Sequence, residues 1–486
     1  MKKIYTGFFM WMLLSHIVVT GCNTIHADHT YQLTRIKVSE TTLILNPGES
    51  KLITITAIPS MAYQPDFQWI SANDTVATVI NGWIKGLTNG STVITVSCGD
   101  VQTEIHVTVK ATCVNETHAI LYEEFINCDN TIPELLLNGV AQYDEEGLNV
   151  IGRDNTVQLD KFYALGERKV QYTIVFSADA KAIFRSSEGD FNAYVDVPNK
   201  RISIATYPAI EQSVDFLEAN QEYLVEVYHI YQKAKLRITD IYTGKFAEVE
   251  AEHDGQGGAG KGVLQQGFSV GMQWDHYCFG LISGVSMHVR KISVIALKKR
   301  VKLLMYGDSI TQPEGYFPSS DFSLSWTQQI LHKLKGNAMS SGRGGAQIGM
   351  ILNYIKNELP YIEAKYVMVT IGTNGGNTEE NLSQLINYIK AQGAIPILNN
   401  IPCNESGTHI ENNKLIEQVR NKWRINGCKF DIATSMNGDG IEVDKSLMYW
   451  EDYSNSYGWQ IFHHPNEKGG QKMFERTLID FPEIYE

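Results

Sequence analysis

The sequence lacks long apolar runs after its first residues, and it contains little cysteine. No later run approaches the roughly 20 apolar residues that a helix needs to cross a bilayer. The 7 cysteines have spacings that match no zinc or redox motif. The chain also has no internal repeat, low-complexity tract or cluster of metal-ligating residues. These absences argue against a polytopic membrane protein, a repeat protein and a zinc module, and we expect no metal and no cofactor.

Basic residues are in short supply relative to acidic ones. The 41 lysines and arginines against 54 aspartates and glutamates give a formal net charge of −13. An acidic balance opposes unspecific attraction to polyanions, so we expect no nucleic-acid partner. The apolar content of 43% is enough for packed cores, and 486 residues predict about three domains at roughly 150 residues each.

The amino terminus has the pattern of an export signal. Lys2 and Lys3 precede an apolar stretch, residues 8–19, that is too short for a membrane span and is followed by small residues before Cys22. Residues 1–21 resemble a bacterial lipoprotein signal peptide, which implies cleavage before Cys22 and lipidation of its sulfur. The mature protein would then be an exported lipoprotein of the cell envelope, anchored to a membrane through Cys22, unless the segment remains as an uncleaved anchor. Export permits a disulfide such as Cys403 with Cys428, although buried thiols fit the sequence equally well.

Short alternating runs separated by turn signals predict a β-sandwich in residues 31–110. Alternating residues follow a Pro-Gly turn at positions 47–48, and a second set runs from Thr92 to Val96. This turn, the Trp69-x-Ser71 segment and the strand at 76–79 together resemble a group 2 bacterial immunoglobulin-like domain. Such a domain is expected to be a spacer, and a binding role is the alternative.

Residues 111–299 are also predicted to be strand-rich, with strands at 170–176, 201–206, 223–229, 235–241 and 285–297. Their size and pattern resemble a concanavalin-like jelly roll. Five aromatic residues of this region could stack on sugar rings or fill the core: Tyr194, Tyr207, Trp274, Tyr277 and Phe279. Alternating strand positions favour the core for most of them.

In residues 300–486, short apolar runs alternate with stretches of helical spacing. The runs at 301–306, 365–371 and 394–401 predict strands buried on both faces. Apolar residues near 326–334, 382–389 and 415–419 keep helical spacing. This alternation predicts a parallel sheet with right-handed crossovers, in which ligands bind at the carboxyl ends of the strands.

Two motifs of this region point to nucleophilic chemistry. Gly307-Asp308-Ser309-Ile310 follows directly on the first predicted strand, and His464-Pro465-Asn466 comes 155 residues after that serine. A serine hydroxyl is a poor nucleophile at neutral pH, so acyl transfer needs an imidazole to take its proton and fixed donors for the oxyanion.

With residues 340–345 and the segment Ile371-Gly372-Thr373-Asn374, these motifs resemble the four blocks of the SGNH (GDSL-type) hydrolases, over residues 301–486. The resemblance implies a three-layer, flavodoxin-like α/β domain after two all-β sandwiches. It implies that Ser309 is the nucleophile and His464 the base. It also implies an oxyanion hole made of the Ser309 N–H, the Gly342 N–H and the Asn374 side-chain amide.

The sequence departs from this family at the catalytic acid. The family usually has an aspartate three residues before the histidine, where this chain has Ile461. We predict Asp452 as a displaced third member, which would fix the imidazole tautomer. A backbone carbonyl could orient His464 instead, and then Trp450, Tyr457 and Trp459 would be read as a wall facing the substrate. His463 is expected to be a neighbour of the base.

These patterns predict a lipid-anchored serine esterase that removes acyl groups, preferably acetyl, from a polysaccharide or oligosaccharide. The substrate class rests on the family resemblance and the attached modules. The alternative is a glycan-binding surface lipoprotein with an inactive hydrolase domain, suggested by Ile461. A lipase or thioesterase is a rival within the same superfamily, and it would prefer long acyl chains.

Overall fold

The computed structural model describes residues 32–45, 50–60, 67–110, 117–126, 131–144, 146–186, 192–207, 209–231, 233–252, 263–264, 276–312, 322–454 and 458–486. The chain divides into two compact units, Met1–Val114 and Asn115–Glu486. The predicted domain 300–486 and all but residues 111–114 of the predicted domain 111–299 thus fall within the second unit. Cys22, Trp274 and Tyr457 lie outside the described residues, as do Cys113 and Cys128.

The first unit is built of short strands whose side chains alternate between a buried and an exposed face. In β1, for example, Ile36 and Val38 are buried and the residues between them are exposed. This period of two follows from the pleat of a strand. The strands are β1 (Arg35–Val38), β2 (Thr42–Leu45), β3 (Ser50–Leu52), β4 (Ile55–Ile58), β5 (Gln68–Ser71), β6 (Ala77–Ile80), β7 (Trp83–Gly86), β8 (Gly90–Cys98) and β9 (Val101–Val109).

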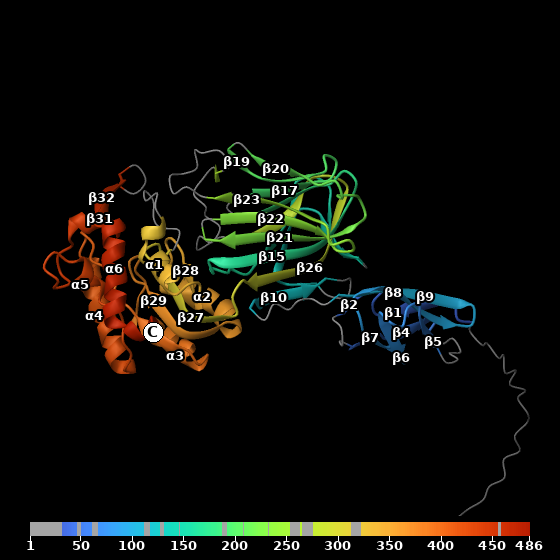
Figure 1. The fold of residues 1–486 in the computed structure, drawn as a ribbon, viewed down its shortest axis with the longest axis horizontal. Helices are drawn as coiled ribbons and strands as arrows, with labels where there is room; N and C mark the ends of the chain where they lie inside the picture. Colours follow the sequence, from blue (N-terminus) through green and yellow to red (C-terminus); the bar gives the residue numbers. More distant parts are fainter. Residues whose placement is uncertain are drawn as a thin grey trace, which may run out of the picture. The chain divides into compact units, whose positions relative to one another are not determined.

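The second unit begins with two large sheets (Figure 1). One runs in the order β12-β13-β26-β15-β21-β22-β23-β24-β19, with β10 also paired to β26. Its strands are β10 (Ala119–Phe125), β12 (Ala141–Asp144), β13 (Gly147–Ile151), β15 (Glu167–Phe176), β19 (Thr206–Tyr207), β21 (Glu222–Ile230), β22 (Lys233–Asp240), β23 (Phe246–Glu252), β24 (Val263–Leu264) and β26 (Ser286–Ala296).

The other sheet runs in the order β11-β14-β25-β16-β17-β18-β20. Its strands are β11 (Leu135–Asn138), β14 (Asn155–Leu159), β16 (Lys181–Ser186), β17 (Asn192–Asp196), β18 (Arg201–Ile204), β20 (Ile210–Ser213) and β25 (Tyr277–Ser283). Apolar residues of both sheets share one core, in which the rings of Tyr172 and Phe279 lie 5.1 Å apart. Of the aromatics singled out in the sequence, Phe279 and Tyr277 are buried and Tyr194 is half-buried. We call these two sheets the middle sandwich.

The helices found among the described residues lie in residues 300–486. The parallel sheet has the order β28-β27-β29-β30. The elements are β27 (Arg300–Gly307), η1 (Phe322–Leu324), α1 (Trp326–Lys333), β28 (Ala338–Gly342), α2 (Ile348–Glu358), η2 (Leu359–Tyr361), β29 (Glu363–Thr370), α3 (Glu379–Ala391), β30 (Ile395–Leu398), α4 (Thr408–Trp423), α5 (Phe430–Thr434), η3 (Lys445–Leu447), β31 (Met448–Tyr453), β32 (Trp459–Pro465), α6 (Glu467–Asp480) and η4 (Pro482–Ile484).

Alternate residues of β27 pack against different helices. Leu303 and Met305 share a core with apolar residues of α1, α5 and α6. Leu304 and Tyr306 belong to a core that includes residues of α2, α3 and α4. Because both faces are covered, the strand reads as a continuous apolar run. This region thus contains a parallel sheet with helices packed on both faces of its strand β27.

Strand β28 and helix α2 are among the elements that the sequence analysis did not predict. Ala338–Gly342 forms strand β28, although Ser340, Ser341 and Gly342 do not read as an apolar run. Residues 348–358 form helix α2, whose buried face includes Ile348, Ile351 and Ile355. This helix keeps the usual helical spacing, so a search for that period would have found it.

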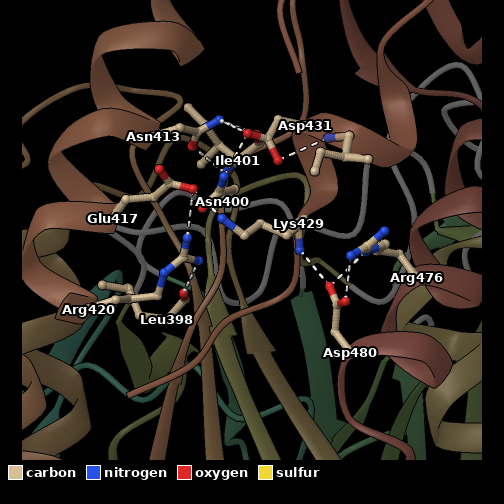
Figure 2. Close-up of polar contacts among 11 residues, drawn as sticks. Leu398, Asn400, Ile401, Asn413, Glu417, Arg420, Lys429, Asp431, Arg476 and Asp480 are labelled. Carbon is tan, nitrogen blue, oxygen red and sulfur yellow. Dashed lines mark hydrogen bonds and ion pairs between the residues drawn. The ribbon is translucent and has the colours of Figure 1, made fainter. Parts of the chain in front are cut away.

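A buried polar cluster fixes the chain after β30 (Figure 2). Asn413 of α4 accepts the Ile401 N–H at 2.8 Å and donates to the Ile401 carbonyl at 2.9 Å. Asp431 accepts the Asn400 amide at 2.6 Å. Arg420 donates to the Leu398 carbonyl at 3.1 Å. These side-chain bonds add to the backbone bonds from the Leu398 and Asn400 N–H groups to the carbonyls of residues 426 and 428, and together they hold α4 and α5 against the sheet.

Two further features of the fold concern the cysteines and membrane-spanning helices. Cys403 and Cys428 are separate buried thiols and do not form the disulfide that the sequence allowed. Among the described residues, no helix combines the length and apolar character that a membrane crossing requires.

Candidate active site

The turn that carries Ser309 leaves the carboxyl end of β27 between two neighbouring strands. Gly307, the last residue of β27, pairs with Gly342 of β28 and with Thr370 of β29. A Cβ on Gly307 would lie 2.1 Å from Thr311 Oγ1 and 2.4 Å from the Thr370 carbonyl oxygen. Only glycine fits where the chain turns back so closely, and this turn brings Ser309 to the carboxyl edge of the sheet.

Asp308 stabilises the turn that carries Ser309. Its side chain is fully buried and Oδ1 accepts the Ile310 N–H at 3.0 Å. Burial raises the pKa of Asp308 to about 6, although that hydrogen bond and the nearby His464 oppose the rise.

Ser309 and His464 are brought together as the sequence predicted. Ser309 Oγ lies 2.7 Å from His464 Nε2, within hydrogen-bond distance for proton transfer. The two side chains come from β27's turn and from β32, and both residues are buried, with 7% and 4% of their surface exposed. Burial beside the opening of a pocket leaves the pair protected from bulk water.

The structure places Glu451 on the His464 ring, and not Asp452 as predicted. Glu451 Oε1 and Oε2 each lie 2.9 Å from His464 Nδ1, and Oε2 also accepts the His464 backbone N–H at 3.0 Å. Asp452 is exposed, and its carboxylate accepts hydrogen bonds from the Ser454 backbone and the Gln460 side chain. Hydrogen bonding by the Ser454 side chain, together with these two bonds, lowers the pKa of Asp452.

The physical reason is the period of two along β31. Adjacent residues of a strand point to opposite faces, so Asp452 faces away from the histidine when Glu451 faces it. In the β31–β32 hairpin, Glu451 pairs with Ile461, the position where the family pattern has an aspartate. The carboxylate at His464 therefore comes from β31, whereas the family pattern has it at position 461 of β32. Trp450 lies on the face opposite Glu451, against Phe462 at a ring distance of 5.0 Å.

The two predicted oxyanion donors lie at the ends of the flanking strands. A Cβ on Gly342 would lie 2.4 Å from the Thr311 carbonyl carbon and 2.6 Å from the Gln312 nitrogen, so the serine turn packs directly on this glycine. Asn374 follows β29 and uses one N–H of its amide to bond the Ala346 carbonyl at 3.0 Å. Gly342 therefore contacts the serine turn, and Asn374 is bonded to the chain that follows β28.

His463 is a neighbour of the base, as expected, and its ring centroid lies 4.3 Å from that of His464. Burial, together with the nearby His464, lowers the pKa of His463 to about 4. Glu451, His463 and His464 offer ligand atoms within 4.8 Å of one another. Glu451 bonds the His464 ring directly, so these two groups are placed to share a proton.

A pocket opens beside the serine. Its lining includes Ser309, His464, Gln312, Trp326 and Tyr449. Trp326 is fixed by a hydrogen bond of 2.7 Å from Nε1 to the Ile310 carbonyl. The pocket therefore combines a nucleophile–base pair with an aromatic wall.

Comparisons with known proteins give one family match. Residues 32–109 match the bacterial Ig-like domain (group 2), which confirms the immunoglobulin-like domain predicted at 31–110. A search of curated protein sequences finds no significant match to the chain.

Several solved structures resemble parts of the chain. A psychrotrophic esterase from Pseudoalteromonas sp. is 17% identical and has a TM-score of 0.29. The matched region covers 38% of this chain and 98% of the esterase chain. An acetyl-xylooligosaccharide esterase from Geobacillus is 14% identical, covers 37% and 93%, and gives 0.29. Arcelin-5, a lectin-like defence protein from Phaseolus vulgaris, is 13% identical, covers 37% and 98%, and gives 0.27. At these values no activity can be transferred to this chain.

Proposed function

We propose that residues 300–486 form a serine ester hydrolase whose catalytic residues are Ser309, His464 and Glu451. The observation that carries the proposal is the hydrogen-bonded series from Ser309 Oγ through the His464 ring to Glu451, with 2.7 Å and 2.9 Å between successive atoms. This is the arrangement in which a base activates a nucleophile and a third group orients the base.

In the proposed reaction, Glu451 accepts a hydrogen bond from Nδ1–H of His464, which leaves the Nε2 lone pair facing Ser309. As Ser309 Oγ forms a bond to the ester carbonyl carbon, its proton moves to Nε2. The carbonyl oxygen becomes an oxyanion. When the tetrahedral adduct collapses, the bond to the alcohol oxygen breaks and Nε2–H protonates that oxygen. Water then attacks the acyl-enzyme with the same help, which releases the acid and restores Ser309.

The oxyanion would be stabilised by the N–H groups of Ser309 and Gly342 and by the Asn374 amide. Asn374 has a second amide hydrogen besides the one bonded to Ala346, and its position after β29 puts it at the same sheet edge as Ser309. Fixed donors of this kind act most strongly in a site that excludes water.

For the substrate, we propose an acyl ester, preferably acetyl, on a polysaccharide or oligosaccharide. The attached β-sandwiches and the resemblance of the sequence motifs to the SGNH hydrolases support this class. Hydrolysis of 4-nitrophenyl acetate against longer 4-nitrophenyl esters tests it, because a lipase or thioesterase would prefer long chains. Activity that rises with chain length would reject the acetyl preference.

We further propose that the mature protein is anchored to a membrane of the cell envelope through a lipid on Cys22. The support is the sequence pattern of residues 1–22. Cys22→Ser should release the protein into the soluble fraction or block signal processing. Unchanged membrane association would contradict the anchor without touching the esterase proposal.

Ser309→Ala tests the nucleophile. The variant should lose turnover of 4-nitrophenyl acetate while its near-ultraviolet circular dichroism spectrum stays that of the wild type. A variant that keeps a tenth of the wild-type kcat would remove Ser309 from this role.

The second candidate function, a glycan-binding protein with an inactive hydrolase domain, was suggested by Ile461. Because Glu451 contacts His464, the chain has a carboxylate at the histidine despite Ile461. A folded wild-type protein without esterase activity would favour this second function.

A further inference from the structure

Strand β28, which ends at Gly342, is an edge strand whose outer side is covered by the middle sandwich. The Ser340 carbonyl accepts the Gly166 N–H at 2.8 Å, and the Ala338 carbonyl accepts Lys298 Nζ at 3.1 Å. A Cβ on Gly166 would lie 2.9 Å from the Ser340 oxygen, so the close approach requires glycine. Backbone groups of an edge strand would otherwise face solvent. Here they are paired across the junction of the two parts of the second unit.

Glu358, the last residue of α2, joins the same two parts with its carboxylate. Oε1 accepts the backbone N–H groups of Ala164 and Leu165, the latter at 3.1 Å. Oε2 accepts the Ser341 hydroxyl at 3.0 Å. The side chain is fully buried, and burial raises the pKa of Glu358 to about 6. All these partners are donors, which suits an ionised carboxylate because it can only accept.

The two serines before Gly342 are therefore tied in opposite directions. Ser341 is bonded to Glu358, and through it to residues 164–165 of the middle sandwich. Ser340 donates its hydroxyl to the Thr311 carbonyl in the turn of Ser309 at 3.1 Å. The position of Gly342 relative to Ser309 is set by these bonds and by the packing of Thr311 on the glycine.

We infer that Glu358 and Ser341 are positioning residues for the oxyanion donor at Gly342, and that the middle sandwich is a structural part of the active site. The inference rests on the proposed esterase function. Glu358 does not contact the reacting atoms, and its effect passes through Ser341 to the adjacent N–H. A displacement of about 1 Å in a catalytic group can cost on the order of a hundredfold in rate, so a modest shift of Gly342 is measurable.

The test compares Ser341→Ala and Glu358→Gln with Asn357→Ala in the full chain. Asn357 is the matched control, because its side chain also bonds the middle sandwich, at the Phe162 carbonyl (3.1 Å), yet that bond does not involve β28. We expect Ser341→Ala and Glu358→Gln to lower kcat about tenfold or more with KM within twofold of wild type. The Ki of a short alkylboronic acid, which forms a tetrahedral adduct on serine, should rise by the same factor. Asn357→Ala should leave kcat and Ki within twofold.

The outcomes separate the two claims. If the wild type is inactive or Ser309→Ala is active, the esterase proposal itself fails. If the wild type is active and folded Ser341→Ala keeps kcat and Ki within twofold, the positioning role is overturned and the esterase stands. A purely structural role would lower the thermal midpoint and leave kcat per folded molecule unchanged, which also overturns it. Should Glu358→Gln fail to fold, Ser341→Ala decides, because it removes one hydroxyl.

Discussion

The exchange of Glu451 for glutamine tests the assignment of the catalytic acid. Oε2 accepts the His464 backbone N–H at 3.0 Å, so the amide oxygen of a glutamine would occupy that place. The amide NH2 would then face Nδ1 in the position of Oε1, at 2.9 Å. The amide oxygen would also lie 2.9 Å from Nδ1, so the NH2 group competes with it there and favours the tautomer that carries the ring proton on Nε2. His464 could then no longer take the proton of Ser309.

The expected loss follows from this change of tautomer. Replacement of the acid of a Ser-His-Asp triad by its amide lowers kcat by about 10⁴. At about 1.36 kcal/mol per tenfold change, that corresponds to about 5 kcal/mol of transition-state stabilisation. We expect Glu451→Gln to lose between about 10³ and 10⁴ in kcat, because both carboxylate oxygens contact the imidazole of this buried pair.

Asp452→Asn is the matched control. It is the next residue of the same strand, and it has the same chemistry on the opposite, exposed face. Its kcat should stay within threefold of wild type in hydrolysis of 4-nitrophenyl acetate, with near-ultraviolet circular dichroism confirming each fold. A loss under tenfold for Glu451→Gln would favour a Ser-His dyad. A severe loss for Asp452→Asn would show that the hairpin has another register.

Three further predictions concern the oxyanion, the fold and the pH dependence. Asn374→Ala should lower kcat by about a hundredfold, since loss of one oxyanion donor costs that much or more, and an unchanged kcat would remove Asn374 from the site. Asn413→Ala should destabilise the protein by about 2 to 4 kcal/mol in denaturant unfolding, because the buried Ile401 N–H and carbonyl lose their partner, whereas Asn412→Ala at the half-buried neighbouring position should cost under 1 kcal/mol. Burial raises the pKa of Asp308 to about 6, so the protonated carboxyl adds stability at low pH that is lost as the pH rises from about 4 through 6. The thermal midpoint of the wild type, measured relative to that of Asp308→Asn, should therefore fall over this pH range. A difference that does not change with pH would refute the raised pKa.

Much of the site could be predicted from the sequence because its parts are local. Ser309 and Asn374 each follow a strand of one parallel sheet and Gly342 ends another, so the topology brings them to one edge. The contact of His464 with Ser309 was inferred from a motif that sits before helix α6. Strand β28 was missed because small polar residues replace the apolar run that marks a buried strand.

The catalytic acid could not be placed in the same way. Choosing between Glu451 and Asp452 requires knowing which face of β31 looks toward the histidine, and one residue reverses the answer. The pairing of Glu451 with Ile461 in the hairpin supplies that information. The contacts of Glu358 with residues 164–165 join positions more than 190 residues apart in the chain, and nothing in the local pattern announces them.

Covalent labelling tests the central claim most directly. A fluorophosphonate reacts with a serine hydroxyl only where a base takes its proton and donors hold the oxyanion, so it reports the assembled site without any assumption about the natural ester. The full chain would be treated with the reagent, digested and mapped by mass spectrometry, beside Ser309→Ala and Glu451→Gln. We predict one phosphonylated peptide, modified at Ser309, which is absent in Ser309→Ala and forms far more slowly in Glu451→Gln. A folded wild-type protein that remains unlabelled, or one labelled at another serine, would contradict the account.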